Sequence, residues 1–308
     1  MPTSTTNENI VYQYKIVSVD HLDELQEDID KLRRAGKLSD HEVYRSYIDT
    51  KKFQVPETIP NAKFLIVIAV LTKLVLVNFH FDGKKHEFMI PPQYYDDGLE
   101  LEDLENVVNK EIIIESGYKI ERSTKLHLKL LAARSGLGKY GRNNICYVDE
   151  MGSLITLYAF FTDFQFDVDN WTEIQMMDYC KRCTTCMNNC PTHAIPTSPE
   201  ENFVINVGKF ITLYNEIDGE FPKWIDPGAH NALEGCMRCQ LTWPGNSKSI
   251  KLTQRFDDVT EEETKKIIEG NPDKNLLNTL SVKIKMFSSS YAKKKFPSFK
   301  RNLEVLLK

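Results

Sequence analysis

Apolar residues in the first third of the chain follow two different spacings. Over residues 20–35 they recur at steps of three and four, which predicts an amphipathic helix that ends near Gly36. Residues 62–81 are instead almost continuously apolar and rich in Ile and Val, which predicts a pair of buried strands followed by a turn at Gly83. The longest apolar run, 64–79, is interrupted by a lysine and is too short to span a bilayer, so we expect no membrane association.

Helical and extended patterns continue to alternate up to about residue 168. The spacing predicts helices over 101–108 and 126–134 and a strand over 153–162. Such a mixture is typical of an α/β domain, in which helices cover a sheet. The composition then changes, because cysteine, proline and short polar linkers dominate residues 179–246.

The last part of the chain is charged and mostly helical in pattern, with a break at Asn271-Pro272. We therefore predict an α+β fold in three parts. They are an α/β domain over residues 1–170, a cysteine-rich domain over 171–250, and a helical segment over 251–308 that packs on the core.

The chain carries a small negative charge. Its 308 residues include 39 Lys and Arg against 44 Asp and Glu, a formal net charge of −5, and 41% are hydrophobic. This composition is sufficient for a buried core, and the acidic field argues against a general nucleic-acid coat protein. The N-terminal residues are polar and lack the apolar stretch of an export signal. We therefore expect a cytoplasmic protein, in which clustered cysteines bind metal rather than form disulfides.

Six of the seven cysteines fall into two groups. The first group has the spacing C-x2-C-x2-C-x3-C followed by proline and consists of Cys180, Cys183, Cys186 and Cys190. In this bacterial ferredoxin pattern three thiolates hold one iron–sulfur cluster and the fourth binds a second cluster. Zinc, which needs only four ligands in two pairs, is the less favoured metal.

The second group, Cys236 and Cys239, would share the second cluster with Cys190, and each cluster then lacks one thiolate. Trp243 precedes a proline where the first cluster's fourth cysteine would stand. The second cluster would need a cysteine near Lys209, and none exists there. Two interpretations stay open. Either each cluster has an unusual fourth ligand or becomes [3Fe–4S], or one cluster is absent. We favour two [4Fe–4S] clusters.

A glycine-rich segment, RSGLGKYGRNN, follows the helix predicted over 126–134. Its three glycines allow the backbone to approach a flat or anionic group closely, or they simply form a tight turn between a helix and a strand. Cys146 follows in an apolar segment and is expected to be a small buried residue rather than a ligand.

Taken together, RSGLGKYGRNN, Gly152-Ser153, CKRCTTCMNNCPTHAI and GCMRCQLTWPGN resemble the cobalamin-dependent epoxyqueuosine reductases and reductive dehalogenases over residues 125–250. The resemblance implies a nitroreductase-like α/β domain that holds cobalamin, a corrinoid. A ferredoxin-like domain with two clusters would follow it and pass electrons to the cobalt. The residues implied along the corrinoid are Ser135, Gly136, Leu137, Gly138, Gly141, Arg142, Gly152 and Ser153.

The resemblance also implies an oxidoreductase that reduces a small organic molecule or a modified nucleoside. A ferredoxin or flavodoxin would supply its low-potential electrons. The alternative is an iron–sulfur electron carrier that reduces or handles a partner corrinoid protein. The acidic proton donor of the reductases lies about fourteen residues before Gly136, which falls on Arg122 with Glu121 beside it. Tyr118 is the candidate for a dehalogenase-type donor. Because this stretch reads ERSTKLHLK and the helical RNA-binding repeats are absent, tRNA is not the favoured partner.

Overall fold

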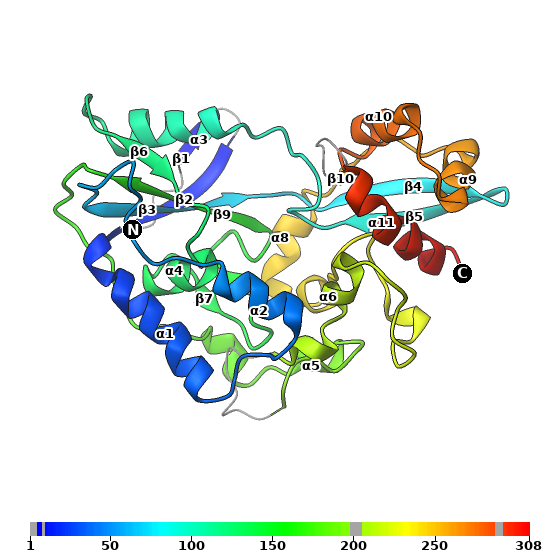
Figure 1. Ribbon diagram of the computed structural model, residues 1–308, viewed down its shortest axis with the longest axis horizontal. Helices are drawn as coiled ribbons and strands as arrows, with labels where there is room; N and C mark the ends of the chain where they lie inside the picture. The colour runs from blue at the N-terminus through cyan, green and yellow to red at the C-terminus, as the bar shows by residue number, and fades with distance from the viewer. Residues whose placement is uncertain (1–4, 8–9, 198–204, 287–291) are drawn as a thin grey trace. The chain divides into compact units, whose positions relative to one another are not determined.

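The computed structural model describes residues 5–7, 10–197, 205–286 and 292–308 (Figure 1). The chain divides into two units, each built from separate stretches. Unit 1 comprises residues 1–71, 99–184 and 196–205, and unit 2 comprises residues 72–98, 185–195 and 206–308. The division into 1–170, 171–250 and 251–308 stays a prediction, and the structure groups residues 72–98 with the C-terminal half of the chain.

Unit 1 is built around an antiparallel sheet with the strand order β1-β2-β3-β9-β6. The strands are β1 (Thr5–Asn7), β2 (Ile10–Ser18), β3 (Phe64–Leu71), β6 (Ile120–Arg122) and β9 (Ile155–Thr162). The central strand β3 is apolar along its whole length because both of its faces are covered. Side chains alternate between the two faces of a strand, so Ile66 lies in the same core as Val107 on one face and Val67 lies in the same core as Leu130 on the other.

Helices cover both faces of this sheet (Figure 1). They are α1 (Leu22–Arg34), α2 (Glu42–Asp49), α3 (Leu101–Val107), its π-helical continuation (Val108–Ile112) and α4 (Leu128–Arg134). The helices predicted over 20–35, 101–108 and 126–134 and the strand predicted over 153–162 are therefore confirmed, with ends that differ by one or two residues. Gly36 has a φ of +65° just beyond α1, as expected of a residue that ends a helix.

A short hairpin follows α4 and carries most of the glycine-rich segment. Its strands β7 (Lys139–Tyr140) and β8 (Cys146–Tyr147) pair antiparallel. Met176 forms an isolated parallel bridge with Tyr140, so the chain just before the cysteine run lies along the outer edge of this hairpin.

Unit 2 contains a smaller sheet with the order β10-β4-β5. Strand β4 (Val75–Phe81) pairs antiparallel with β5 (Lys84–Ile90) and parallel with β10 (Gln254–Arg255). The three C-terminal helices are α9 (Glu261–Glu269), α10 (Lys274–Lys283) and α11 (Ala292–Leu306). Residues of β4 and of these helices form one core, which includes Phe79, Leu280 and Phe299. The predicted helical C-terminal region and its break near residue 271 are confirmed.

Four helices of four to six residues complete unit 2. They are α5 (Thr185–Asn188), α6 (Ile211–Glu216), α7 (Arg238–Leu241) and α8 (Ser247–Ile250). None of the helices in the described part of the chain is both long enough and apolar enough to cross a bilayer.

The strand pair predicted over 62–81 is wrong as a pairing, although both strands exist. Strand β3 lies between β2 and β9 in unit 1, whereas β4 pairs with β5 and β10 in unit 2. The three residues between β3 and β4 contain no glycine or asparagine that would favour a tight turn, and the chain passes from one unit to the other at this point. The turn itself is confirmed one strand later, where Asp82 and Gly83 have φ values of 50° and 68°.

Candidate functional site

The six clustered cysteines are divided between the two units. Cys180 and Cys183 belong to unit 1, and the other four belong to unit 2. Cys180 lies in a 3-10 helix, Asp178–Lys181, and is buried. Burial raises the pKa of the Cys180 thiol and the nearby Cys183 adds to this, while a hydrogen bond from the backbone of Arg142 lowers it.

Arg142 therefore holds the start of the cysteine run. Besides its backbone contact with the Cys180 thiol, its Nη2 donates to the carbonyl oxygen of Cys180 at 3.0 Å. The resemblance implied that Arg142 lies along a corrinoid, which stays a prediction, and in the structure its side chain lies against the first cysteine of the iron–sulfur pattern. The glycine-rich segment and the cysteine run are joined by this residue.

In unit 2, N–H donors point at two cysteine sulfurs. The backbone N–H of Ala194 donates to Cys190 Sγ at 3.3 Å, and Asn231 Nδ2 donates to Cys236 Sγ at 3.2 Å. Burial raises the pKa of the Cys236 thiol, hydrogen bonds from Asn231 and from the Arg238 backbone lower it, and the charge of Cys190 raises it. The interaction between the two thiols shows that Cys190 and Cys236 approach each other.

These sulfurs fit the role of cluster ligands. Iron binds the thiolate, and N–H groups that donate to sulfur stabilise that charged form inside a partly buried site. Cys239 lies in α7, one helical turn after Cys236, and helices α5 and α7 pack together. In the described ranges no three His, Cys, Asp or Glu side chains are arranged to hold a single metal ion.

Trp243 and Lys209 stand where the sequence pattern lacks a cysteine. Trp243 directly precedes a 3-10 helix, Pro244–Asn246. A Cβ atom on Gly245 would overlap the indole ring, so the ring lies flat against this glycine. Lys209 ends another 3-10 helix, Val207–Lys209, and is exposed.

The glycines at 138 and 141 are required by the chain's own packing. A Cβ atom on Gly138 would overlap the sulfur of Cys146, and one on Gly141 would lie 2.5 Å from Cε2 of Tyr147. Both contacts are with strand β8, which folds back over the glycine-rich segment. Of the two interpretations drawn from the sequence, this geometry matches the tight turn between a helix and a strand.

The other residues assigned to the corrinoid are also engaged within unit 1. The hydroxyl of Ser135 donates to the carbonyl of Ala132 at 3.1 Å, and Leu137 is buried in the core. Gly152 exchanges two backbone hydrogen bonds of 2.9 Å with Val148, and Ser153 is buried. Cys146 is buried in the same core, as expected, and burial raises its pKa to about 12.

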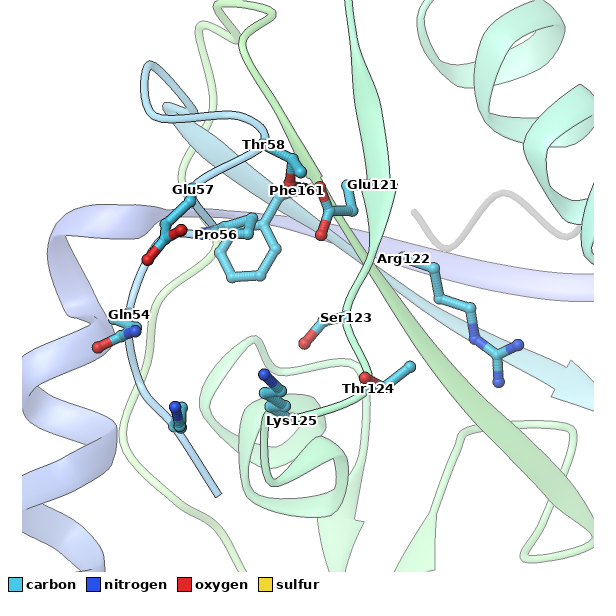
Figure 2. A pocket seen from close by; sticks show the side chains of 11 residues that line it. Gln54, Pro56, Glu57, Thr58, Glu121, Arg122, Ser123, Thr124, Lys125 and Phe161 are labelled. Carbon is cyan, nitrogen blue, oxygen red and sulfur yellow. Dashed lines mark hydrogen bonds between the residues drawn. The ribbon is translucent and has the colours of Figure 1, made fainter. Parts of the chain in front are cut away.

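A polar pocket of about 400 Å3 lies at the end of β6 in unit 1 (Figure 2). One wall is the segment 121–125, which connects β6 to α4, and the opposite wall is the segment 52–58. Residue 161 of β9 forms the floor between them. The lining residues are Lys52, Gln54, Pro56, Glu57, Thr58, Glu121, Arg122, Ser123, Thr124, Lys125 and Phe161.

Strand geometry decides which side chain of β6 enters this pocket. Glu121 pairs with Phe161 and Arg122 pairs with Phe160 across two antiparallel strands, so the two side chains of β6 face opposite sides of the sheet. Glu121 points at Thr58, whose hydroxyl donates to its carboxylate, and Arg122 turns away (Figure 2). The guanidinium of Arg122 lies 5.1 Å from the centre of the Tyr158 ring.

The two catalytic candidates thus have different positions. Glu121 lines the pocket, whereas Tyr118 is 40% exposed and packs edge-on against Phe164 with ring centres 4.7 Å apart. The wall formed by residues 52–58 was not predicted from the sequence. It has no motif, and it is tied to the segment 121–125 by the hydrogen bond from Thr58 to Glu121 and by one from the backbone of Lys52 to the carbonyl of Lys125, at 3.1 Å.

Comparison with known proteins identifies the cysteine region. Residues 179–246 match the family described as a 4Fe-4S double cluster binding domain. The epoxyqueuosine reductase of Yersinia pestis is 31% identical over 157 residues, which cover 51% of this chain and 33% of that protein. The epoxyqueuosine reductase of Cellulophaga algicola is 28% identical over 226 residues, which cover 67% of this chain and 64% of that protein. The chain spans about a third of the length of several curated relatives that it matches.

Solved structures extend the likeness to most of the chain. The epoxyqueuosine reductase of Streptococcus thermophilus superposes with a TM-score of 0.66 at 16% identity, covering 96% of this chain and 76% of that one. A Bacillus subtilis structure with its catalytic loop swung out of the active site gives a TM-score of 0.63 at 18% identity, with the same coverage. The predicted α+β class is confirmed. This chain is therefore similar to the epoxyqueuosine reductases, shares their fold, and matches a 4Fe–4S double cluster binding domain over residues 179–246.

Proposed function

We propose that the chain is an iron–sulfur reductase in which cysteine-bound clusters deliver low-potential electrons to an organic substrate. The observation that carries the proposal is the arrangement of N–H donors around Cys180, Cys190 and Cys236 within the double cluster domain. An N–H group that donates to sulfur favours the thiolate form that iron binds, and at Cys180 and Cys236 the donors offset part of the rise in pKa that burial causes. Clusters bound there supply one-electron reduction at low potential.

The pocket of unit 1 supplies the protons that such a reduction needs. An organic substrate that gains electrons also takes up protons, so a carboxyl group in hydrogen-bonding reach assists the reaction. Glu121 lies in the pocket next to the position where the related enzymes have their acidic donor, and Thr58 orients its carboxylate. We assign Glu121 the role of proton donor. The ammonium groups of Lys52 and Lys125 attract an anionic part of the substrate.

The resemblance also implies that the protein binds cobalamin. Within unit 1, however, the residues implied for it do not form an exposed surface on which a flat cofactor could lie. Gly138 and Gly141 are covered by β8, and Arg142 is engaged with Cys180. The reduction that we propose therefore does not include a corrinoid. Titration of the protein with cob(II)alamin, followed by EPR, tests this directly, because bound corrinoid would change the cobalt signal.

The substrate class proposed for the first test is a modified nucleoside in tRNA. One structural neighbour, with a TM-score of 0.64, is an epoxyqueuosine reductase with a tRNA-Tyr epoxyqueuosine-modified stem loop. This favours a nucleoside over the small organic molecule, although the ERSTKLHLK stretch made tRNA the less favoured partner in the sequence. A ferredoxin or flavodoxin is proposed as the electron donor.

The test uses anaerobically reconstituted protein, reduced flavodoxin and the epoxyqueuosine-modified tRNA-Tyr stem loop as the probe. We expect turnover that falls about 100-fold or more in Glu121→Gln, because a positioned general acid contributes at least this much. Glu57→Gln, which removes the other pocket carboxylate, is the matched control and should retain nearly full rate. Unchanged turnover in Glu121→Gln, with iron content intact, would exclude the donor role.

The second candidate is an electron carrier that reduces a partner protein. It is favoured by one observation: the polar ERSTK stretch replaces the donor segment of the related enzymes, and Arg122 stands at the aligned position. A carrier would be oxidised by its partner at a rate proportional to the partner's concentration. It would show no turnover of the stem loop at full iron content.

A further inference from the structure

Three cysteines of unit 2 are available for the second cluster, which has four irons. They are Cys190, Cys236 and Cys239. The remaining cysteine of this unit, Cys186, belongs to the first cluster by its spacing, and Cys146 is buried in the core of unit 1. The sequence contains no further cysteine, so the fourth iron has no thiolate from this chain.

The segment where the sequence pattern needs the fourth thiolate leads directly into α6, which packs near Cys236. Ile211, the first residue of α6, is 1% exposed and belongs to the apolar cluster against which Cys236 packs. Lys209 and Phe210 immediately precede it. A phenyl ring has no donor atom, and an ammonium group has no lone pair, so neither residue replaces the missing thiolate.

A cationic group lies next to the same site. Arg238 stands between Cys236 and Cys239, and its charge acts on the Cys236 sulfur. Its Nη2 donates to the carbonyl of Gly228 at 2.7 Å, but its Nε–H is buried and has no hydrogen-bond partner in the described stretches. A buried donor without a partner is costly, and a guanidinium N–H is well suited to an anion.

We propose that the cluster held by Cys190, Cys236 and Cys239 keeps one iron without a protein ligand and binds a small anion there, with Arg238 as the second contact. The ligand class is an anionic oxygen, sulfur or carbon donor, such as a carboxylate, a thiolate or cyanide. The inference rests on the proposed function in one respect only, because it needs a cluster at these three cysteines.

The first test is anion binding to the reduced, reconstituted full chain, with [13C]cyanide as the probe. We expect 13C hyperfine coupling in the EPR-based spectrum of the wild type. In Cys190→Ser, the part of this coupling that comes from the cluster at Cys190, Cys236 and Cys239 should be lost. Arg238→Gln should raise the cyanide concentration for half-saturation about tenfold or more, the loss expected of one charge-assisted hydrogen bond. Arg255→Gln, at an exposed arginine of β10 in the same unit, is the matched control and should bind as the wild type does.

The second test supplies the missing ligand. Ferricyanide removes one electron from [4Fe–4S]2+, and the resulting [4Fe–4S]3+ core releases an unprotected iron as Fe2+ and leaves [3Fe–4S]+. We expect the wild type to develop the EPR signal of a three-iron cluster. Lys209→Cys or Phe210→Cys should reduce this signal and retain about one more iron per chain. Cys146→Ser controls for the change in cysteine content and should behave as the wild type does.

The outcomes separate this inference from the proposed function. Full iron content with no cyanide coupling and no three-iron signal would overturn the open iron and leave the iron–sulfur reductase standing. A chain that takes up no iron at Cys190, Cys236 and Cys239, seen as no change of the iron count in Cys190→Ser, would overturn both.

Discussion

Arg134 of α4 and Asp28 of α1 form a bidentate ion pair inside unit 1. Arg134 Nε and Nη2 each donate to one carboxylate oxygen of Asp28 at 2.7 Å, and the two side chains are only 8% and 12% exposed. The pair joins the helix that leads into the glycine-rich segment to the helix that covers the sheet. Arg134 also lies over the ring of Trp171, 5.3 Å from its centre.

Removing one partner of this pair should destabilise the protein strongly. Asp28→Ala leaves the buried guanidinium with one exposed carboxylate, Glu173, so we expect a loss of about 3 kcal/mol or more in the free energy of unfolding. Asp30→Ala breaks the exposed pair with Arg33 and should cost less than about 1 kcal/mol. Urea unfolding of the two variants measures both values, and equal losses would contradict the prediction.

His21 should make the stability of unit 1 depend on pH. Burial lowers its pKa, but hydrogen bonds to Glu24 and Asp169, at 2.6 and 2.8 Å, outweigh burial, so the pKa is raised above the ordinary 6.5. The stabilisation is fully present below pH 6.5 and is lost as the pH rises through the raised folded value. The difference in unfolding free energy between wild type and His21→Gln should therefore shrink on going from about pH 6 to about pH 9. A difference that grows with pH would refute this.

Gly138 should be intolerant of a methyl group for a purely steric reason. Its φ is not positive, yet the added Cβ would overlap the Cys146 sulfur, so Gly138→Ala should cost about 1–3 kcal/mol. Cys146→Ala in the same chain should recover part of this loss, which a double-mutant cycle detects as a favourable coupling. Gly208→Ala is the control, because its nearest atom would lie at 3.4 Å.

Asn231 should affect the reduction potential and the iron retention of the cluster proposed in unit 2. Its Nδ2 donates to Cys236 Sγ, and its Oδ1 accepts from the backbone N–H of Met237 at 2.9 Å. Asn231→Leu removes a donor that stabilises the more negative, reduced cluster, so the reduction potential should fall. Loss of iron to a chelator should become about tenfold faster. EPR-monitored redox titration measures the shift, and Asn189→Leu, at an exposed asparagine in the same unit, should show none.

Local sequence patterns were sufficient to predict the helices and the cysteine-rich domain. The strand order was not predictable, because it depends on pairing between distant parts of the chain. The spacing around Leu25 and Ile29 was sufficient for α1, because the residues that form it are neighbours in sequence. The partner of β3 was not predictable in this way, since Ile66 pairs with Phe160 almost a hundred residues later. A continuous apolar run shows that a strand is buried but not which strand lies beside it.

The candidate site shows the same limit. Cysteine spacing alone predicted the double cluster domain, because the cysteines fall into two groups whose neighbouring members lie within a few residues of each other. The role of Arg142 and the wall at Lys52 depend on contacts between distant segments, and no motif marks either. The choice between Glu121 and Arg122 needed the register of β6 against β9.

The core of unit 2 sets an order for folding during synthesis. Val75 and Phe79 of β4 are made early, but they pack against Leu280 and Phe299, which leave the ribosome roughly two hundred residues later. The first two of the three stretches of unit 1, by contrast, are complete by residue 184. The β4–β5 hairpin must therefore wait with an uncovered apolar face while the rest of the chain is translated. This interval is where a chaperone or a protease would act on the nascent protein.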